Sequence, residues 1–255
     1  MSPPERPYDA LATVYEWLVP DALLEPAGAA AAFATVLDGL PPAASVLDCA
    51  AGTGQLAVGI ALQGFTVCAS DVSGAMVERT RALAAEHGAA VRAVRCAWEE
   101  LGEQGWDAAF DAVLCVGNSL THAAGRERRR GALAAMGGVL RPGGVLAVTS
   151  RNWELLRAAR PGLQVGERLV ERRGRAGLVV RAWTLPDEWD APHRLDVAVA
   201  LPDERGAVET RGGALRFWPF THEELDADLL AAGLAPATST YAPGVERYLV
   251  TARPS

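Results

Sequence analysis

The stretch SVLDCAAGTGQLA, residues 45–57, decides the fold of this 255-residue chain. Two apolar residues begin a short strand, small residues lead into Gly52-Thr53-Gly54, and apolar spacing then resumes as in a helix. Glycine lets a backbone approach a ligand closely, and the unpaired N–H groups of a helix N-terminus point to the same place. The stretch therefore predicts a strand, a turn and a helix with a nucleotide-like cofactor over the turn. Spacing alone leaves the cofactor open, because Gly52-x-Gly54-x-x-Ala57 also fits the dinucleotide fingerprint.

Apolar strands alternate with amphipathic helices from residue 45 to residue 150. This alternation is typical of a parallel sheet covered by helices on both faces, and ligands of such sheets bind beyond the carboxyl ends of the strands. Asp71 closes the strand FTVCASD at a spacing suited to a ribose hydroxyl pair, and Ser73 is the expected N-cap of the next helix. The other predicted strand ends carry Asp48, Ala97-Trp98, Gly117-Asn118 and Arg151-Asn152.

Four motifs give the chain a family resemblance. LDCAAGTG and DVSGAMV resemble the first and second motifs of class I S-adenosylmethionine-dependent methyltransferases. CVGNSLTH at 115–122 and SRNW at 150–153 are similar to those of glycine and sarcosine N-methyltransferases and their small-molecule relatives. The resemblance implies an α/β fold with a Rossmann-like, doubly wound, seven-stranded, mostly parallel sheet, a C-terminal antiparallel strand and a small antiparallel lid sheet. It also implies methyl transfer to a small-molecule acceptor, at the nitrogen of an amine or amino acid.

The cofactor expected from this resemblance is S-adenosylmethionine. A carboxylate at Asp48 would favour its sulfonium and ammonium groups, although Asp48 could instead cap a turn. Met76 and Trp98 are expected beside the adenine, with packing in the core as the alternative for both. The full set of expected cofactor-binding residues is Tyr8, Asp48, Ala50, Gly52, Gly54, Asp71, Val72, Met76, Ala97, Trp98, Val116, Gly117 and Asn118.

Two residues are candidates for the chemistry at the acceptor. His122 follows the fourth strand, and an ordinary imidazole takes up a proton near neutral pH, although a structural role would also explain it. The resemblance implies that Arg151 binds the carboxylate of an amino acid substrate. The alternative is that Arg151 is an ordinary surface arginine. Trp153 stands where the family more usually has tyrosine, which leaves the acceptor's identity open. The residues expected to bind the acceptor are Tyr15, His122, Arg151, Trp153 and Trp218.

The sequence divides into a cap, a core and a lid. Residues 1–42 are predicted to be a helical cap, because PYDALATVYEWLVP has helical apolar spacing. Residues 43–155 and 219–255 form the predicted cofactor-binding core, in which RPGG at 141–144 is expected to be a tight turn. Residues 156–218 form a predicted antiparallel lid over the acceptor site, because alternation of period two dominates there.

Composition restricts the remaining possibilities. A net charge of -7 argues against a nonspecific nucleic-acid surface, and the arginine run at 126–130 is expected on a solvated helix face or in an N-terminal helical turn. No apolar run reaches the roughly 18 residues of a membrane span, so no membrane partner is expected. Four cysteines without CxxC spacing indicate buried thiols in a reducing cytoplasm and no metal site. A homo-oligomer is compatible with the sequence.

Three other functions stay open. Methylation of oxygen or carbon in a secondary metabolite would use the same core, because the acceptor is chosen by the lid. A dinucleotide-dependent oxidoreductase is disfavoured, because all 24 basic residues are arginine and no Tyr/Lys pair exists. A noncatalytic cofactor-binding protein would retain the cofactor residues without methyl transfer.

Overall fold

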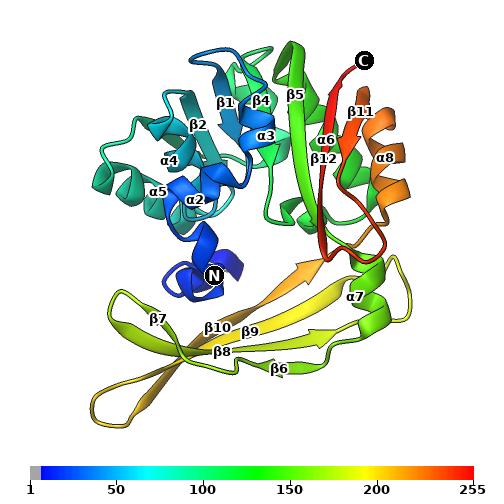
Figure 1. Cartoon of the computed structure of the whole chain (residues 1–255). Helices are drawn as coiled ribbons and strands as arrows, with labels where there is room; N and C mark the ends of the chain where they lie inside the picture. The colour runs from blue at the N-terminus through cyan, green and yellow to red at the C-terminus, as the bar shows by residue number, and fades with distance from the viewer. Residues whose placement is uncertain (1–6) are drawn as a thin grey trace.

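A computed structural model describes residues 7–255, which form two sheets with helices around the larger one (Figure 1). The larger sheet has seven strands in the order β11-β12-β5-β4-β1-β2-β3. Its strands are β1 (Ser45–Asp48), β2 (Thr66–Asp71), β3 (Val91–Arg95), β4 (Phe110–Cys115), β5 (Leu140–Arg151), β11 (Leu234–Ser239) and β12 (Arg247–Pro254).

The pairing of the strands confirms the predicted fold class. β1 pairs in parallel with β2 and β4, and the pairs β2/β3 and β4/β5 are parallel as well. β12 runs antiparallel to both of its neighbours, β5 and β11. The sheet is therefore mostly parallel, with its antiparallel strand at the C-terminus of the chain.

Apolar layers cover both faces of this sheet. Neighbouring residues of a strand point to opposite faces, so Val46 joins the apolar cluster under α4 (Gln55–Leu62) while Leu47 joins the one under α6 (Arg126–Gly138). α5 (Gly74–Glu86) contributes to the first layer and α8 (His222–Ala231) to the second. This double burial explains why the strands read as continuous apolar runs.

Two helix caps follow the sequence prediction. Ser73 Oγ accepts a hydrogen bond from the Met76 backbone N–H at 3.2 Å and caps α5. Thr221 caps α8, and Glu224 returns a hydrogen bond to the Thr221 N–H, which completes a capping box. The arginine run begins α6, and Arg126 and Arg128 are exposed there, as expected for a solvated N-terminal turn. Arg126, Arg129 and Arg130 also donate hydrogen bonds to the buried Asp228 of α8, which the sequence did not predict.

The N-terminal segment is broken into short pieces. The predicted helical cap consists of α1 (Pro7–Leu11), η1 (Tyr15–Leu18), η2 (Asp21–Leu23), α2 (Pro26–Ala31) and α3 (Ala34–Leu37). Val14 has φ −124°, and Pro20 and Pro26 interrupt the regular hydrogen bonding. The expected cap residues 1–6 lie outside the described part of the chain.

The RPGG motif differs from its prediction. Residues 141–144 lie within β5, where the register against β4 shifts between Phe110 and Ala112. Gly143 has φ +79°, which accommodates a bulge at this shift. The motif therefore bends a strand and does not precede it as a turn.

The second sheet is antiparallel, as expected for residues 156–218. Its strands are β6 (Leu163–Val165), β7 (Val170–Arg172), β8 (Arg175–Thr184), β9 (His193–Pro202) and β10 (Val208–Phe217), and α7 (Trp153–Ala159) precedes them. One face packs Val179, Val197 and Phe217 against Leu11 and Trp17 of the N-terminal segment. Figure 1 shows the short N-terminal helices between this sheet and the larger one.

Candidate active site

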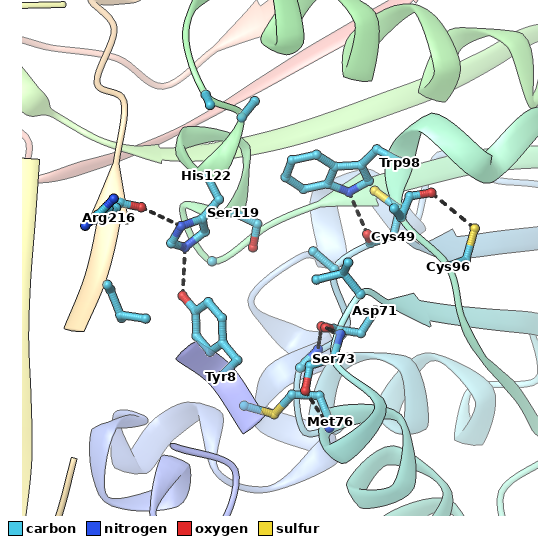
Figure 2. A pocket seen from close by; sticks show the side chains of 18 of the residues that line it. Tyr8, Cys49, Asp71, Ser73, Met76, Cys96, Trp98, Ser119, His122 and Arg216 are labelled. Atoms are coloured by element: carbon cyan, nitrogen blue, oxygen red, sulfur yellow. Dashed lines mark hydrogen bonds between the residues drawn. The ribbon is translucent and has the colours of Figure 1, made fainter. Parts of the chain in front are cut away.

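A cavity of about 720 Å³ lies where the carboxyl ends of β1, β2 and β4 meet the N-terminal helices and β10. Figure 2 shows Asp71, Met76 and Trp98 on one side of it and Tyr8, His122 and Arg216 on the other. The predicted residues that line it are Tyr8, Tyr15, Ala50, Gly52, Asp71, Val72, Met76, Ala97, Trp98, Gly117, His122 and Trp218. The strand ends therefore bring most of the predicted site together.

The turn between β1 and α4 is fixed by the carboxylate of the next strand. Asp71 Oδ2 accepts a hydrogen bond from the Gly52 N–H at 2.9 Å, and Oδ1 accepts one from the Ser73 N–H at 2.8 Å. Thr80 Oγ1 donates to the Gly52 carbonyl at 3.0 Å from the other side. Gly52 has φ +57° and presents no side chain to the cavity. The result is an open backbone bend beside an oriented carboxylate.

An aromatic wall closes the cavity beyond β3. The indole N–H of Trp98 donates to the Cys49 carbonyl at 2.8 Å, which fixes the ring (Figure 2). Met76 and Ala97 also line this side. The wall is apolar and flat, with its one indole donor already satisfied, so it suits a planar ring that is held by stacking.

Tyr8 and His122 meet at the opposite wall. The Tyr8 hydroxyl lies 2.8 Å from His122 Nε2, and His122 Nδ1 lies 2.8 Å from the Arg216 carbonyl. A carbonyl only accepts, so Nδ1 carries the hydrogen and Nε2 accepts the hydrogen of Tyr8. Burial lowers the pKa of His122 to about 4 despite the carbonyl of Arg216. The imidazole is therefore neutral at pH 7 and acts as a hydrogen-bond acceptor.

Asp48 lies under the turn and outside the cavity lining. It is buried, and its Oδ1 has no hydrogen-bond partner in residues 7–255. Burial raises the pKa of Asp48 to about 7, because the hydrogen bond from the Ala50 backbone does not compensate for the lost water and Asp71 repels the charge. An unsatisfied carboxylate of this kind would be stabilised by a nearby cation.

Asn118 lies outside the cavity, unlike most of the predicted cofactor-binding residues. Its φ of +70° turns the side chain into the protein, where Nδ2 donates to Thr121 Oγ1 at 3.0 Å. Oδ1 accepts from the Arg151 backbone N–H at 2.9 Å. Asn118 therefore joins the ends of β4 and β5 and does not line the cavity. The neighbouring Val116 also lies outside the lining.

Three further predicted residues lie away from the cavity. Trp153 is 1% exposed and packs against Trp183 and Phe217, so its expected contact with the acceptor is replaced by packing in the core. Gly54 faces Thr80, and a Cβ added at Gly54 would lie 2.8 Å from the Thr80 side-chain carbon Cγ2. The Arg151 guanidinium lies 5.7 Å from the centroid of the Trp183 ring, at the side of the smaller sheet.

The cavity is also lined by residues that no sequence pattern predicts. Ala214, Leu215 and Arg216 of β10 line the wall beside His122, and Ser119 lies next to Gly117. Alternation of apolar residues predicts that β10 is a strand, but it does not say which other element the strand meets. Nothing in residues 7–255 groups three His, Cys, Asp or Glu side chains as a metal site would, and no helix there is long and apolar enough to cross a membrane.

Comparison with known proteins agrees with this geometry. Residues 46–144 match the protein family described as "Methyltransferase domain". Glycine/sarcosine N-methyltransferase of Parasynechococcus marenigrum (strain WH8102) is 37% identical over 114 residues, which are 45% of this chain and 40% of that protein. The enzyme of the same name from Aphanothece halophytica is 35% identical over 111 residues, or 44% of this chain and 42% of that protein. The match thus spans less than half the length of these relatives.

Solved structures share the whole fold. The CcbJ methyltransferase of Streptomyces caelestis superposes with a TM-score of 0.75 at 23% identity and covers 98% of this chain and 99% of its own. CalS10, described as an amino pentose methyltransferase of Micromonospora echinaspora with SAM bound, gives a TM-score of 0.68 at 24% identity, with 95% of each chain covered. Both sheets therefore recur together in known proteins.

Proposed function

We propose, from the match of residues 46–144 to the methyltransferase domain, that this chain transfers a methyl group from S-adenosylmethionine to the nitrogen of a small amine or amino acid. The observation that carries the proposal is Asp71, which holds the side-chain-free bend at Gly52 at the mouth of a large cavity. The relatives named glycine/sarcosine N-methyltransferase support nitrogen as the acceptor atom.

The residues of the cavity fit this cofactor. Each oxygen of Asp71 accepts one backbone N–H beside the cavity, and a carboxylate at the end of this strand is the group expected to bind the ribose hydroxyls. Trp98 and Met76 provide the apolar wall for the adenine. Asp48 supplies the independent observation, because its buried Oδ1 without a partner suits a cationic ligand above the turn. When bound, S-adenosylmethionine supplies a methyl group on a positively charged sulfur.

The chain's own contribution is alignment. Correct placement of two reactants contributes roughly 7 to 11 kcal/mol to lowering a barrier, and this reaction needs no strong base when the amine arrives uncharged. Tyr8 gives its hydrogen to His122, so its oxygen presents only lone pairs to the cavity. It would accept an N–H of the acceptor and direct the nitrogen's own lone pair. The N-terminal helices and β10 would keep water away from this wall.

The remaining assignments follow the same proposal. Residues 1–42 serve as cap, 43–155 with 219–255 as core, and 156–218 as a lid that selects the acceptor. Arg151 would bind an acidic group of the acceptor from its place between β5 and Trp183. We assign the chain to the cytoplasm, because all four cysteines are buried free thiols.

Cofactor binding is the first test. Isothermal titration should show binding of S-adenosylhomocysteine and none of NAD. Asp71→Ala should weaken this binding at least tenfold, because it removes both the ribose acceptor and the anchor of the bend. Asp107→Ala, at an exposed carboxylate on the loop before β4, is the matched control and should bind normally. Tight binding of NAD, or unchanged binding by Asp71→Ala, would contradict the proposal.

Methyl transfer is the second test. The chain is incubated with S-adenosylmethionine labelled in the methyl group and with an amine and amino-acid panel that includes glycine and sarcosine. A metabolite extract of the producing cells serves as a second acceptor source. Mass analysis should find the label on nitrogen. Label on oxygen or carbon would contradict N-methylation and support the alternative O- or C-methyltransferase. No label on any compound of the panel or of the extract would support a noncatalytic role.

A further inference from the structure

Three arginines from three strands border the space between the larger sheet and the smaller one. Arg151 ends β5, and Arg247 begins β12 directly opposite it in the antiparallel register. Side chains at such opposed positions point to the same face of the sheet. Arg181 lies on β8, opposite the buried Val197, so it shares the inward face of the smaller sheet with Val179 and Trp183.

Trp183 connects the two sheets at this point. The Arg151 guanidinium lies 5.7 Å from the centroid of its ring, and Trp183 is two residues from Arg181 on the same face. The three arginines therefore lie at one corner of the fold, near enough for their charges to act on one another. Burial, the charge of Arg247 and the charge of Arg181 lower the pKa of Arg151 to about 10. Burial and the charge of Arg247 also lower the pKa of Arg181.

No carboxylate forms an ion pair with these three arginines in the described part of the chain. None of the three arginines forms an ion pair or side-chain hydrogen bond within residues 7–255, whereas Arg129 and Arg172 elsewhere each bind an aspartate. Glu246 lies close enough to favour the charged form of Arg151, but it makes no ion pair with it. Like charges opposite each other destabilise a sheet, so the arrangement costs stability until an anion occupies it.

The corner adjoins the acceptor side of the cavity. Tyr15 lines the cavity, and its ring lies within the electrostatic field of Arg247. The Arg151 backbone is joined to Asn118, which follows the cavity residue Gly117. Trp98 and Asp71, by contrast, lie on the other side of the cavity in Figure 2. The three arginines thus lie on the acceptor side of the molecule, beyond the lining of the cavity itself.

We propose that Arg151, Arg181 and Arg247 form an anion site that holds a phosphate group of the methyl acceptor. The number of arginines favours phosphate over a carboxylate. One guanidinium group is enough to bind a carboxylate through two hydrogen bonds. Three guanidinium groups without a carboxylate partner match an anion with two charges and three peripheral oxygens. The inference rests on the proposed function and adds Arg181 and Arg247 as residues that select the acceptor.

Binding of inorganic phosphate to the full chain tests the site without turnover. At constant ionic strength, phosphate and pyrophosphate should raise the melting temperature and bind saturably in titration, and acetate at the same concentration should not. Arg181→Gln and Arg247→Gln should each weaken phosphate binding about tenfold. Arg175→Gln, at an exposed arginine of the same strand β8 that pairs with Glu209, should bind phosphate normally.

Saturation with S-adenosylhomocysteine separates this site from the cofactor site. Phosphate should still bind, and each variant should bind S-adenosylhomocysteine as the unmodified chain does, which also shows that it is folded. Because Arg247 is exposed at the start of its strand, its variant keeps the test valid if Arg181→Gln does not fold. Equal binding of acetate, unchanged phosphate binding by Arg247→Gln, or loss of phosphate binding with the cofactor site filled would each overturn the inference. Failure of methyl transfer alone would leave these binding results unchanged.

Discussion

Tyr8 and His122, which are 114 residues apart in the chain, share a hydrogen bond of 2.8 Å across the candidate active site. The bond joins α1 to the 3-10 helix η4 (Ser119–His122) after β4 and makes the first described helix part of the cavity wall. The Arg216 carbonyl of β10 fixes the other side of the imidazole. One tyrosine and one histidine thus connect the cap, the core and the second sheet at the place where the acceptor is expected.

Tyr8→Phe should lower kcat about tenfold and leave the binding of S-adenosylhomocysteine unchanged, because we propose that its hydroxyl contacts the acceptor and not the cofactor as the resemblance implied. The variant loses one hydrogen bond to the acceptor nitrogen, and a bond of about 1 to 1.5 kcal/mol corresponds to roughly that factor. The pKa of His122 near 4 makes it a weak proton acceptor for an amine. The acid limb of the pH–rate profile should therefore follow the acceptor's own amine and stay where it is in Tyr8→Phe.

The alternative for this pair is proton transfer through Tyr8 to His122. In that case Tyr8→Phe would lower kcat by a factor of 10² or more, and the acid limb of its pH–rate profile would shift. Tyr241→Phe is the control. The Tyr241 hydroxyl also donates a hydrogen bond, to the Glu154 carboxylate, but Tyr241 does not line the cavity.

Gly54→Ala should destabilise the chain more than Gly64→Ala. Both glycines have φ +92°, so each alanine incurs the left-handed strain of about 1 to 2 kcal/mol. Only at Gly54 would the new Cβ lie 2.8 to 2.9 Å from Thr80, including its backbone Cα, whereas nothing lies within 4 Å at Gly64. Overpacking of this kind adds about 1 to 3 kcal/mol. Urea unfolding of the two variants measures the difference, and equal midpoints would show that Thr80 moves aside freely.

The sequence predicts the parts of this site that depend on neighbours along the chain. Gly52, Asp71 and Trp98 follow from a turn and two strand ends, because parallel strands bring their carboxyl ends together whatever surrounds them. The apolar alternation also predicts the second sheet. These features depend on local pattern and on a topology with few alternatives.

The missing parts depend on contacts that no local pattern encodes. Arg216 contributes a backbone carbonyl to His122, and a carbonyl has no signature in the residue type. Asn118 was expected in the cavity because it follows β4, but its positive φ turns the amide inward. The edge strand β11 was not identified within LAPATS, because five of its six residues are exposed and show no alternation.

Asp48→Asn should stabilise the cofactor-free chain in neutral and basic solution. Burial raises the pKa of Asp48 from 3.8 to about 7, so the unfolded chain ionises this carboxyl more readily than the folded one. The resulting cost is absent below pH 4, grows as the pH rises toward 7 and is constant above it. Asparagine does not ionise, so its advantage should follow the same course and reach a few kcal/mol, at about 1.4 kcal/mol per pKa unit.

The same substitution should weaken the binding of S-adenosylmethionine, because the uncompensated carboxylate that destabilises the empty chain is the group that a cationic ligand would stabilise. Thermal unfolding of both chains from pH 4 to pH 8.5 measures the first effect, and titration at pH 8 measures the second. Asp107→Asn, at an exposed carboxyl, should show neither. A stability difference that does not change with pH would mean that Asp48 keeps its charge at no cost. Unchanged cofactor binding would place the cation away from the end of β1.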